Sequence, residues 1–117
     1  MADIHVWIEH NGKIVDPEMP SYARVRDIRG LVDKQRYEEN TTLRETIMPT
    51  VKKHLKAYKT LSKWSTEQVL RDFYNEPKNN MCHVNAYAYK CHHPDSRIVI
   101  GKMGWERPDG TVFWEFG

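Results

Sequence analysis

The stretch "IHVWIEHNGKIVDP", Ile4–Pro17, decides the fold that we expect for this chain. Its first half alternates apolar and polar side chains, which is typical of a β-strand with one buried face. Asn11-Gly12 follows, and this dipeptide is the strongest short signal for a two-residue hairpin loop. The stretch therefore predicts a β-hairpin with strands at residues 4–9 and 13–16.

The two-residue loop also fixes which side chains share a face of this hairpin. It places Ile8 opposite Val15 and Trp7 opposite Asp16. His5 then lies on the same face as Trp7 and Asp16. The apolar side chains of the other face, which we expect to pack on the core, are Val6, Ile8 and Val15.

The bulk properties indicate an ordinary globular chain. With 117 residues and a net charge of +2, the sequence predicts a single domain over residues 1–117 and gives no strong electrostatic argument for nucleic acid. The opening "MADIHVWIEH" lacks the charged and apolar regions of a signal peptide, and no stretch is long and apolar enough to span a membrane. We therefore expect a cytoplasmic protein.

Helices are expected in the middle of the chain. Residues 17–40 form a mixed connector that can hold a short helix and an extended piece at residues 35–39. Residues 42–75 look helical, with a break at Pro49, and Ser65 with Gln68 forms a capping-box pattern. The apolar stripe of this region comprises Leu43, Ile47, Val51, Leu55 and Leu61.

The last third of the chain predicts one more helix and a second hairpin. The helix covers residues 81–91, enters through Asn79 or Asn80 as N-cap, and follows the breaker at residues 76–80. Two strands, at 97–105 and 111–117, flank the turn "ERPDG". The fold class is accordingly α+β, with an antiparallel sheet packed against helices.

Cys82 has the setting of a nucleophile. It lies in the first turn of the predicted helix, where the helix dipole favours a thiolate and unpaired backbone N–H groups can bind an oxyanion. A thiolate nucleophile also needs a histidine base that a third group orients. His5 and Asp16, on one face of the first hairpin, are close enough to supply that pair.

These two segments resemble parts of the papain-like and transglutaminase-like cysteine enzymes. "MCHVNAYAY" is similar to their nucleophile helix, which opens with a cysteine and often carries Asn-Ala shortly afterwards. "HVWIEHNGKIVDPE" is similar to their histidine hairpin. In those families the cysteine helix comes first, followed by a hairpin strand, the histidine strand and the aspartate strand. The order in this chain is reversed.

Circular permutation accounts for the reversed order. The final stretch "IVIGKMGWERPDGTVFWEFG" resembles the strands that normally lead into the histidine strand, which here begins the chain. The chain ends are then expected at a turn between Phe116 and His5. Permuted relatives of the NlpC/P60 group are the natural comparison, and a compact permuted enzyme of this kind would suit a phage or viral protein.

The resemblance implies roles for particular residues. Cys82 matches the nucleophile, His5 the general base and Asp16 the group that orients His5. Trp7 matches an aromatic residue that screens the His–Asp contact from water. The oxyanion would be bound by the Cys82 backbone N–H and by a side chain from Asn79 or Asn80. No cofactor or metal is implied.

Several neighbouring residues have simpler interpretations. His83 is expected to point away from Cys82, and Asn85 to serve packing or a helix–loop hydrogen bond. Cys82 and Cys91 are too far apart along one helix to form a disulfide, so we expect free thiols. The histidines and cysteines at 82–83 and 91–93 lack the spacing of a zinc site.

The sequence therefore predicts a cysteine hydrolase or acyltransferase that acts on an amide or thioester in a protein, peptide or other substrate. Amidase or peptidase, deamidase and transglutaminase-like activities stay open. The alternative is a catalytically inactive binding module on the same fold, recognising a peptide, a glycan or nucleic acid. The basic, aromatic stretch at 51–64 could bind phosphate backbones, although nucleic acid is the less favoured partner.

Overall fold

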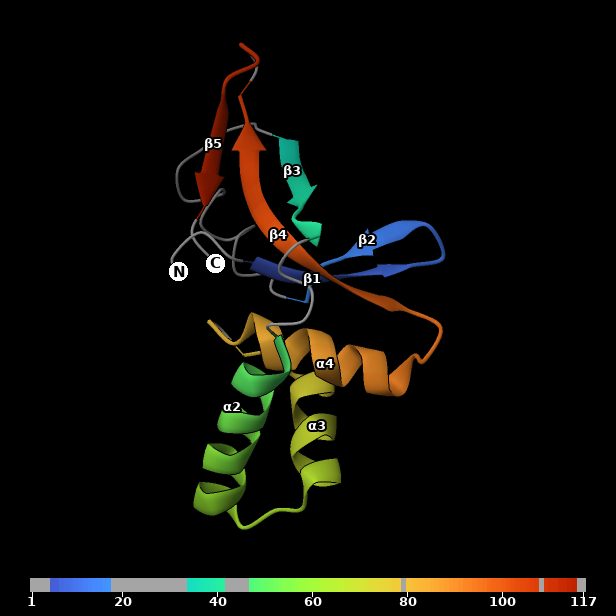
Figure 1. Ribbon diagram of the computed structural model, residues 1–117, viewed down its shortest axis with the longest axis vertical. Coiled ribbons are helices and arrows are strands. Elements are labelled where there is room, and N and C mark those ends of the chain that lie inside the picture. The colour runs from blue at the N-terminus through green and yellow to red at the C-terminus, as the bar shows by residue number, and fades with distance from the viewer. Residues whose placement is uncertain (1–4, 18–33, 42–46, 79, 108, 116–117) are drawn as a thin grey trace.

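The computed structural model describes residues 5–17, 34–41, 47–78, 80–107 and 109–115 (Figure 1). In chain order its elements are β1 (His5–His10), β2 (Lys13–Val15), β3 (Lys34–Glu39), α2 (Ile47–Ser62), α3 (Thr66–Asn75), α4 (Cys82–His92), β4 (Arg97–Glu106) and β5 (Val112–Glu115). The expected α+β class with an antiparallel sheet and helices is confirmed. The short helix expected within 17–40 and the residue Leu43 lie outside the described residues.

The first hairpin has the predicted loop and register. β1 and β2 pair with Ile8 opposite Val15 and His10 opposite Lys13. Asn11 and Gly12 both have positive φ, at 54° and 74°, as a twisted two-residue hairpin loop requires. The Asn-Gly dipeptide is present because few other residues adopt this conformation without strain.

Strand β4 is the centre of the sheet. The strand order is β2-β1-β4-β3, and β5 also pairs with β4, all in antiparallel fashion. The long, strongly curved β4 is flanked by β1 along its first half and by β3 along its second half (Figure 1). The two flanking strands meet at Gly101, which pairs with His5 on one side and Glu39 on the other.

Strands β5 and β1 follow one another along the same edge of β4. β5 pairs with Met103–Glu106 on the edge opposite β3, and β1 pairs with Arg97–Gly101 on that same edge. Both are antiparallel to β4, so they run in the same direction. The two strands are therefore collinear, and the expected turn between Phe116 and His5 falls on residues outside those that the structure describes.

The helices α2 and α3 form a hairpin that lies beyond α4 from the sheet (Figure 1). Pro49 lies in the first turn of α2, where a missing N–H is tolerated, so the predicted break does not occur. Ser65 caps α3 and forms the predicted capping box with Gln68. Leu61 was expected on the apolar stripe but is 84% exposed, because α2 extends past the core at that end.

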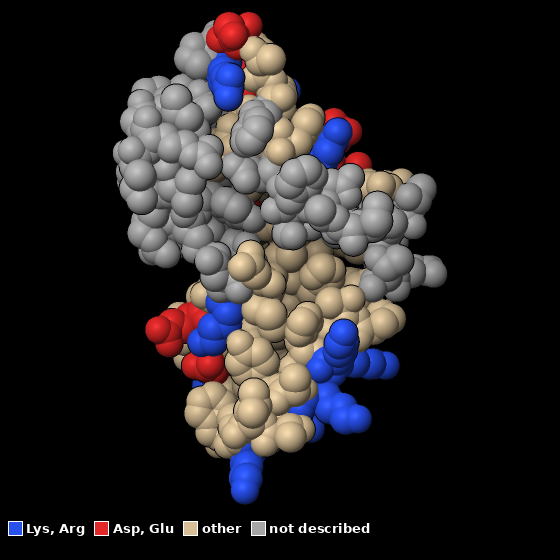
Figure 2. All heavy atoms as spheres, turned by 90° about the vertical axis from the view of Figure 1, so that its left-hand side faces the viewer, with Lys and Arg blue, Asp and Glu red and all other residues tan. Residues whose placement is uncertain are grey.

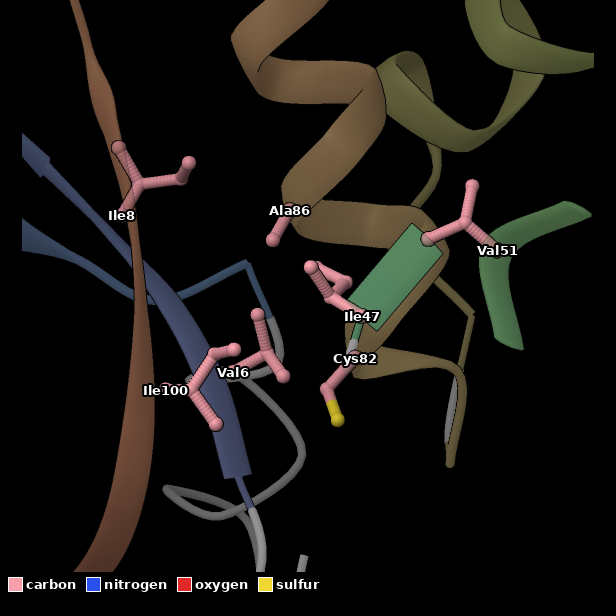
Figure 3. Close-up of a cluster of buried hydrophobic side chains, with 7 residues drawn as sticks. All are labelled: Val6, Ile8, Ile47, Val51, Cys82, Ala86 and Ile100. Atoms are coloured by element: carbon pink, nitrogen blue, oxygen red, sulfur yellow. The ribbon is translucent and has the colours of Figure 1, made fainter. Parts of the chain in front are cut away.

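The core lies between the sheet and α4. One cluster joins both hairpin and helix residues: Val6, Ile8, Ile47, Val51, Cys82, Ala86 and Ile100 (Figure 3). A second cluster joins α3 to α4 through Val69, Leu70, Phe73, Val84 and Ala88. Within the described part of the chain, no helix is long and apolar enough to cross a membrane.

Candidate active site

Cys82 is the first residue of α4 and lies at the edge of the core. Met81 is the N-cap and forms no side-chain capping bond, so the expected capping by Asn79 or Asn80 is wrong. The first turn holds no acidic residue, and the positive end of the helix dipole therefore acts on the Cys82 thiol without opposition from a carboxylate there. In Figure 3 the Cys82 sulfur points away from the start of α4, on the lower side of the cluster that Val6, Ile47 and Ile100 form. Cys82 and Cys91 are both free, as expected.

His5 and Asp16 form a buried pair. The Nε2 atom of His5 donates to the Oδ2 atom of Asp16 at 2.8 Å, and the two side chains are only 1% and 2% exposed. The hydroxyl of Tyr37 donates to the same carboxylate oxygen, also at 2.8 Å. Two donors therefore hold the Asp16 carboxylate, and the carboxylate fixes the orientation of the His5 ring.

Asp16 and Cys82 both act on the pKa of His5. Burial lowers the pKa of His5, but hydrogen bonds to Asp16 and to Cys82 outweigh burial and raise the pKa from 6.5 to about 10. The Nε2 atom is committed to Asp16, and Nδ1 is a buried atom of the ring. Asp16 and Cys82 thus both act on the charge of His5.

The Cys82 thiol is correspondingly acidic. Burial raises its pKa, but the hydrogen bonds and charges of His5 and then His83 lower it from 9.0 to about 7. The Nδ1 atom of His83 lies 3.6 Å from the Cys82 sulfur. The expectation that His83 points elsewhere is therefore wrong: an adjacent side chain on the helix reaches back to the sulfur.

Together these shifts favour a charged pair at neutral pH. A thiol with a pKa of about 7 beside an imidazole with a pKa of about 10 gives a thiolate and an imidazolium over the interval between those values. The buried imidazolium has negative groups on both sides, Asp16 and the Cys82 thiolate. Such an arrangement supplies a nucleophile and a proton donor in one place.

Trp7 and Gly101 enclose this pair. The Trp7 ring is 3% exposed, stacks on His5 with centroids 5.9 Å apart, and contacts Tyr37 at 4.9 Å. The face that carries His5 and Trp7 is thus as buried as the apolar face of β1. A Cβ atom on Gly101 would overlap the Glu38 carbonyl oxygen and lie 2.8 Å from Trp7, so only glycine fits there.

The remaining residues that the sequence analysis singled out are three asparagines at the start of α4 and just before it. Asn79 lies outside the described residues, and Asn80 is exposed in a left-handed turn with φ of 60° just before α4. Asn85 is buried, and its amide bonds to both backbone groups of Lys78 at 3.0 and 2.7 Å. Its expected role in a helix–loop hydrogen bond is confirmed.

Sequence reasoning missed two residues of this site. Tyr37 lies in the connector, and nothing in its local sequence says that β3 brings it to Asp16. His83 was set aside on the angle between neighbouring helix residues alone. The adjacency of a cysteine and a histidine at a helix start was the signal that could have identified it, because long side chains there can fold back on the first turn.

A cavity of about 360 Å³ lies close to the site. Val15 and Pro17, which flank Asp16, form one wall, and Asn85 and Tyr89 of α4 contribute another. Cys82, His5 and Asp16 do not line it. Among the described side chains, no group of three or more His, Cys, Asp or Glu is arranged to hold a metal ion.

No protein-family model, curated protein or solved structure matches this chain. The resemblance to the papain-like and transglutaminase-like enzymes therefore rests on the sequence motifs and stays a prediction.

Proposed function

We propose that this chain is a cysteine-dependent acyl-transfer enzyme in which Cys82 is the nucleophile, His5 the general base and acid, and Asp16 the residue that orients His5. The observation that carries the proposal is the buried His5–Asp16 pair beside a buried thiol at the start of a helix, where the hydrogen bonds and charges of His5 and His83 lower the pKa of Cys82 to about 7 against the effect of burial. A structural cysteine in a core has no need of a buried imidazole or of a lowered pKa. A non-catalytic binding module would not need this arrangement either.

The chemistry follows from the charged pair. The Cys82 thiolate attacks a carbonyl carbon and forms a C–S bond, and the electron pair of the C=O bond moves onto oxygen. In this scheme the backbone N–H groups at the start of α4 bind that oxyanion. The oxyanion collapses, the C–N bond breaks, and the His5 imidazolium gives its proton to the leaving amine. An acyl-thioester on Cys82 results.

The second half of the reaction restores the enzyme. A water or amine attacks the thioester carbon, neutral His5 takes its proton, and the C–S bond breaks to release the thiolate. Water gives hydrolysis, and an amine gives transfer. If the substrate is a glutamine side chain, the leaving group is ammonia and the outcome with water is deamidation.

An acyl-enzyme test examines the proposal directly. The protein is mixed with an activated ester such as p-nitrophenyl acetate, and the acetylated residue is identified by mass spectrometry. We expect a rapid burst with the acetyl group on Cys82, which Cys82→Ser and His5→Ala abolish and Cys91→Ser leaves intact. Equal labelling of Cys82 and the exposed Cys91 would contradict a specialised nucleophile.

We also propose that the fold is a circularly permuted papain-like core. The collinearity of β5 and β1 supports this, because joining them with a short loop puts both strands in succession along one edge of β4 and restores the order cysteine helix, strands, histidine strand, aspartate. Glu115 and His5 face residues only two apart on β4, a separation of about 7 Å. The six residues between them when the ends are joined span up to about 20 Å.

A rearranged chain tests the permutation. Residue 117 is joined to residue 1, and the chain is opened between Lys63 and Trp64 in the exposed connection of α2 and α3. We expect cooperative unfolding and a Cys82 pKa that stays near 7. The matched control, joined in the same way but opened between Gly101 and Lys102, interrupts the central strand and should not fold. If the first variant also fails to fold, the ends do not meet as proposed.

A further inference from the structure

A basic groove runs along α2 and its connection to α3, beyond Val51, where α2 leaves the core that holds Cys82. Its volume is about 460 Å³, and its walls carry Lys52, Lys56, Lys59 and Lys63, with Leu55 and Trp64 between them. Figure 2, which views the molecule from the side of α2, shows cationic side chains around an uncharged surface in the helical half, with anionic ones on one side. This groove is separate from the Cys82 site.

The charge of this groove is not balanced locally. The sequence of α2 contains no aspartate or glutamate, and Lys53 adds a fifth lysine beside the groove. None of these five ammonium groups forms an ion pair with a residue that the structure describes. They are five of the eighteen basic residues of the chain, so the other thirteen are outnumbered by its sixteen acidic residues. Positive charge is thus concentrated at the groove, and the rest of the chain has a slightly negative net charge.

The spacing of the four lysines suits an elongated partner. Positions 52, 56 and 59 are separated by four and three residues, which places their side chains along one side of α2. With a rise of 1.5 Å per residue these three span about 10 Å, and Lys63, which follows the end of the helix with a φ of 62°, continues the row. A polyanion that follows it presents a negative group about every 5 to 6 Å, as acidic residues one helical turn apart do.

Apolar surface in the same place distinguishes between polyanions. Leu55 lines the groove, Trp64 is 45% exposed beside it, and Leu61 is 84% exposed at the tip of α2. A partner that covers these side chains needs apolar groups among its negative ones. Single-stranded nucleic acid normally stacks several bases on several aromatic rings, and here the lining holds one ring and no arginine.

We propose that the groove along α2 and its connection to α3 binds an acidic polypeptide segment that carries apolar residues among its carboxylates. The lysines pair with the carboxylates, and Leu55 and Trp64 receive the apolar side chains. A second claim rests on the proposed function: the acidic segment belongs to the protein substrate on which Cys82 acts. The first turns of α2 link the two places, because Ile47 and Val51 pack in the cluster that contains Cys82.

Binding is measured separately from catalysis. The full chain with Cys82→Ser is titrated into a fluorescein-labelled peptide of about twelve residues, the helical length that matches the row of lysines. The peptide repeats Glu-Leu-Glu-Glu, and the comparison probes are the same peptide with every Glu replaced by Gln and a single-stranded oligothymidylate. Fluorescence anisotropy reports binding at two salt concentrations.

The variants locate the binding surface. We expect Lys56→Glu/Lys59→Glu to weaken binding of the acidic peptide at least about tenfold, because each reversal removes an attraction and adds a repulsion. Lys13→Glu/Arg107→Glu makes the same change in net charge on exposed residues of the sheet half and should alter the affinity less than about twofold. Trp64→Ala should weaken binding while leaving the salt dependence unchanged.

Three results would overturn the proposal: equal weakening by both double variants, equal binding of the Gln peptide, or tighter binding of the oligothymidylate. The last result would assign the groove to nucleic acid. The proposed reaction fails separately, in the acyl-enzyme test. If the acidic peptide binds but Cys82 is not acylated, the groove is a docking site for acidic segments, and the claim that such a segment belongs to a substrate of Cys82 is refuted.

Discussion

Replacing His5 by alanine tests the origin of the reactive thiol. Burial alone raises the pKa of Cys82, and the hydrogen bond and charge of His5 contribute more than those of His83 to bringing it down to about 7. Without His5 the burial persists and only His83 opposes it. We therefore expect the pKa of Cys82 in His5→Ala to return to its ordinary value of 9.0 or above.

The size of the effect on reactivity follows from that shift. At pH 7 the thiolate fraction falls from about one half to about one in a hundred when the pKa rises by about two units. A more basic thiolate is intrinsically more nucleophilic, by about eightfold for this shift at a Brønsted slope of about 0.45. The net result is alkylation about sixfold slower at pH 7 and several-fold faster near pH 10, so the two rate profiles cross.

Iodoacetamide alkylation measures both profiles. The parent carries Cys91→Ser, so that the exposed second thiol does not contribute. His83→Ala is the matched control. The Nδ1 atom of His83 lies 3.6 Å from the Cys82 sulfur, and His83 lowers the Cys82 pKa less than His5 does. We therefore expect a smaller rise in that pKa than in His5→Ala. The reasoning is refuted if the His5→Ala profile superimposes on that of the parent, or if His83→Ala shifts it more.

Three further predictions concern the support and pH range of the site. Tyr37→Phe removes a hydrogen bond to the Asp16 carboxylate and should lower the free energy of unfolding by about 2 kcal/mol in urea denaturation, with a smaller effect in an Asp16→Asn background. Gly101→Ala should lower it by about 3 kcal/mol or more, whereas Gly12→Ala, which meets no neighbouring atom but has positive φ, should lower it by about 1 kcal/mol. Turnover of an ester substrate should rise as the pH passes about 7, where Cys82 ionises, and fall as it passes about 10, where His5 loses its proton. Limbs at the ordinary values of an imidazole and a thiol, 6.5 and 9.0, in place of about 7 and about 10, would exclude the charged pair.

Local signals account for the parts of the fold that the sequence predicted well. The loop Asn11-Gly12 requires positive φ at two positions, so it specified the hairpin and its register together. Ser65 and Gln68 satisfy backbone donors at the start of α3 within four residues of chain. In both cases the interactions that decide the structure are close in sequence, and no knowledge of distant contacts is needed.

The errors arose where distant contacts decide. Leu61 has the spacing of a core residue, but the core ends before that turn of α2, and periodicity contains no information on where a neighbouring element stops. Tyr37 reaches Asp16 only because β3 pairs with β4. Helix α4 begins at Cys82 after Met81, whose side chain does not cap the backbone N–H groups of the first turn. Capping preferences favour an asparagine at that position, so they predicted the wrong N-cap.

Gly101 explains why a site can be assembled from segments so far apart in the chain. β1 and β3 flank β4 over successive stretches, and their ends meet at this one residue, opposite His5 and Glu39. Without a side chain there, the backbone at Glu38 and the Trp7 ring approach β4 closely. That approach lets Tyr37 of β3 and His5 of β1 bond to the same oxygen of Asp16. The orientation of the His5 ring thus depends on how closely β1, β3 and β4 approach one another at Gly101, as much as on the residues around the Cys82 thiol.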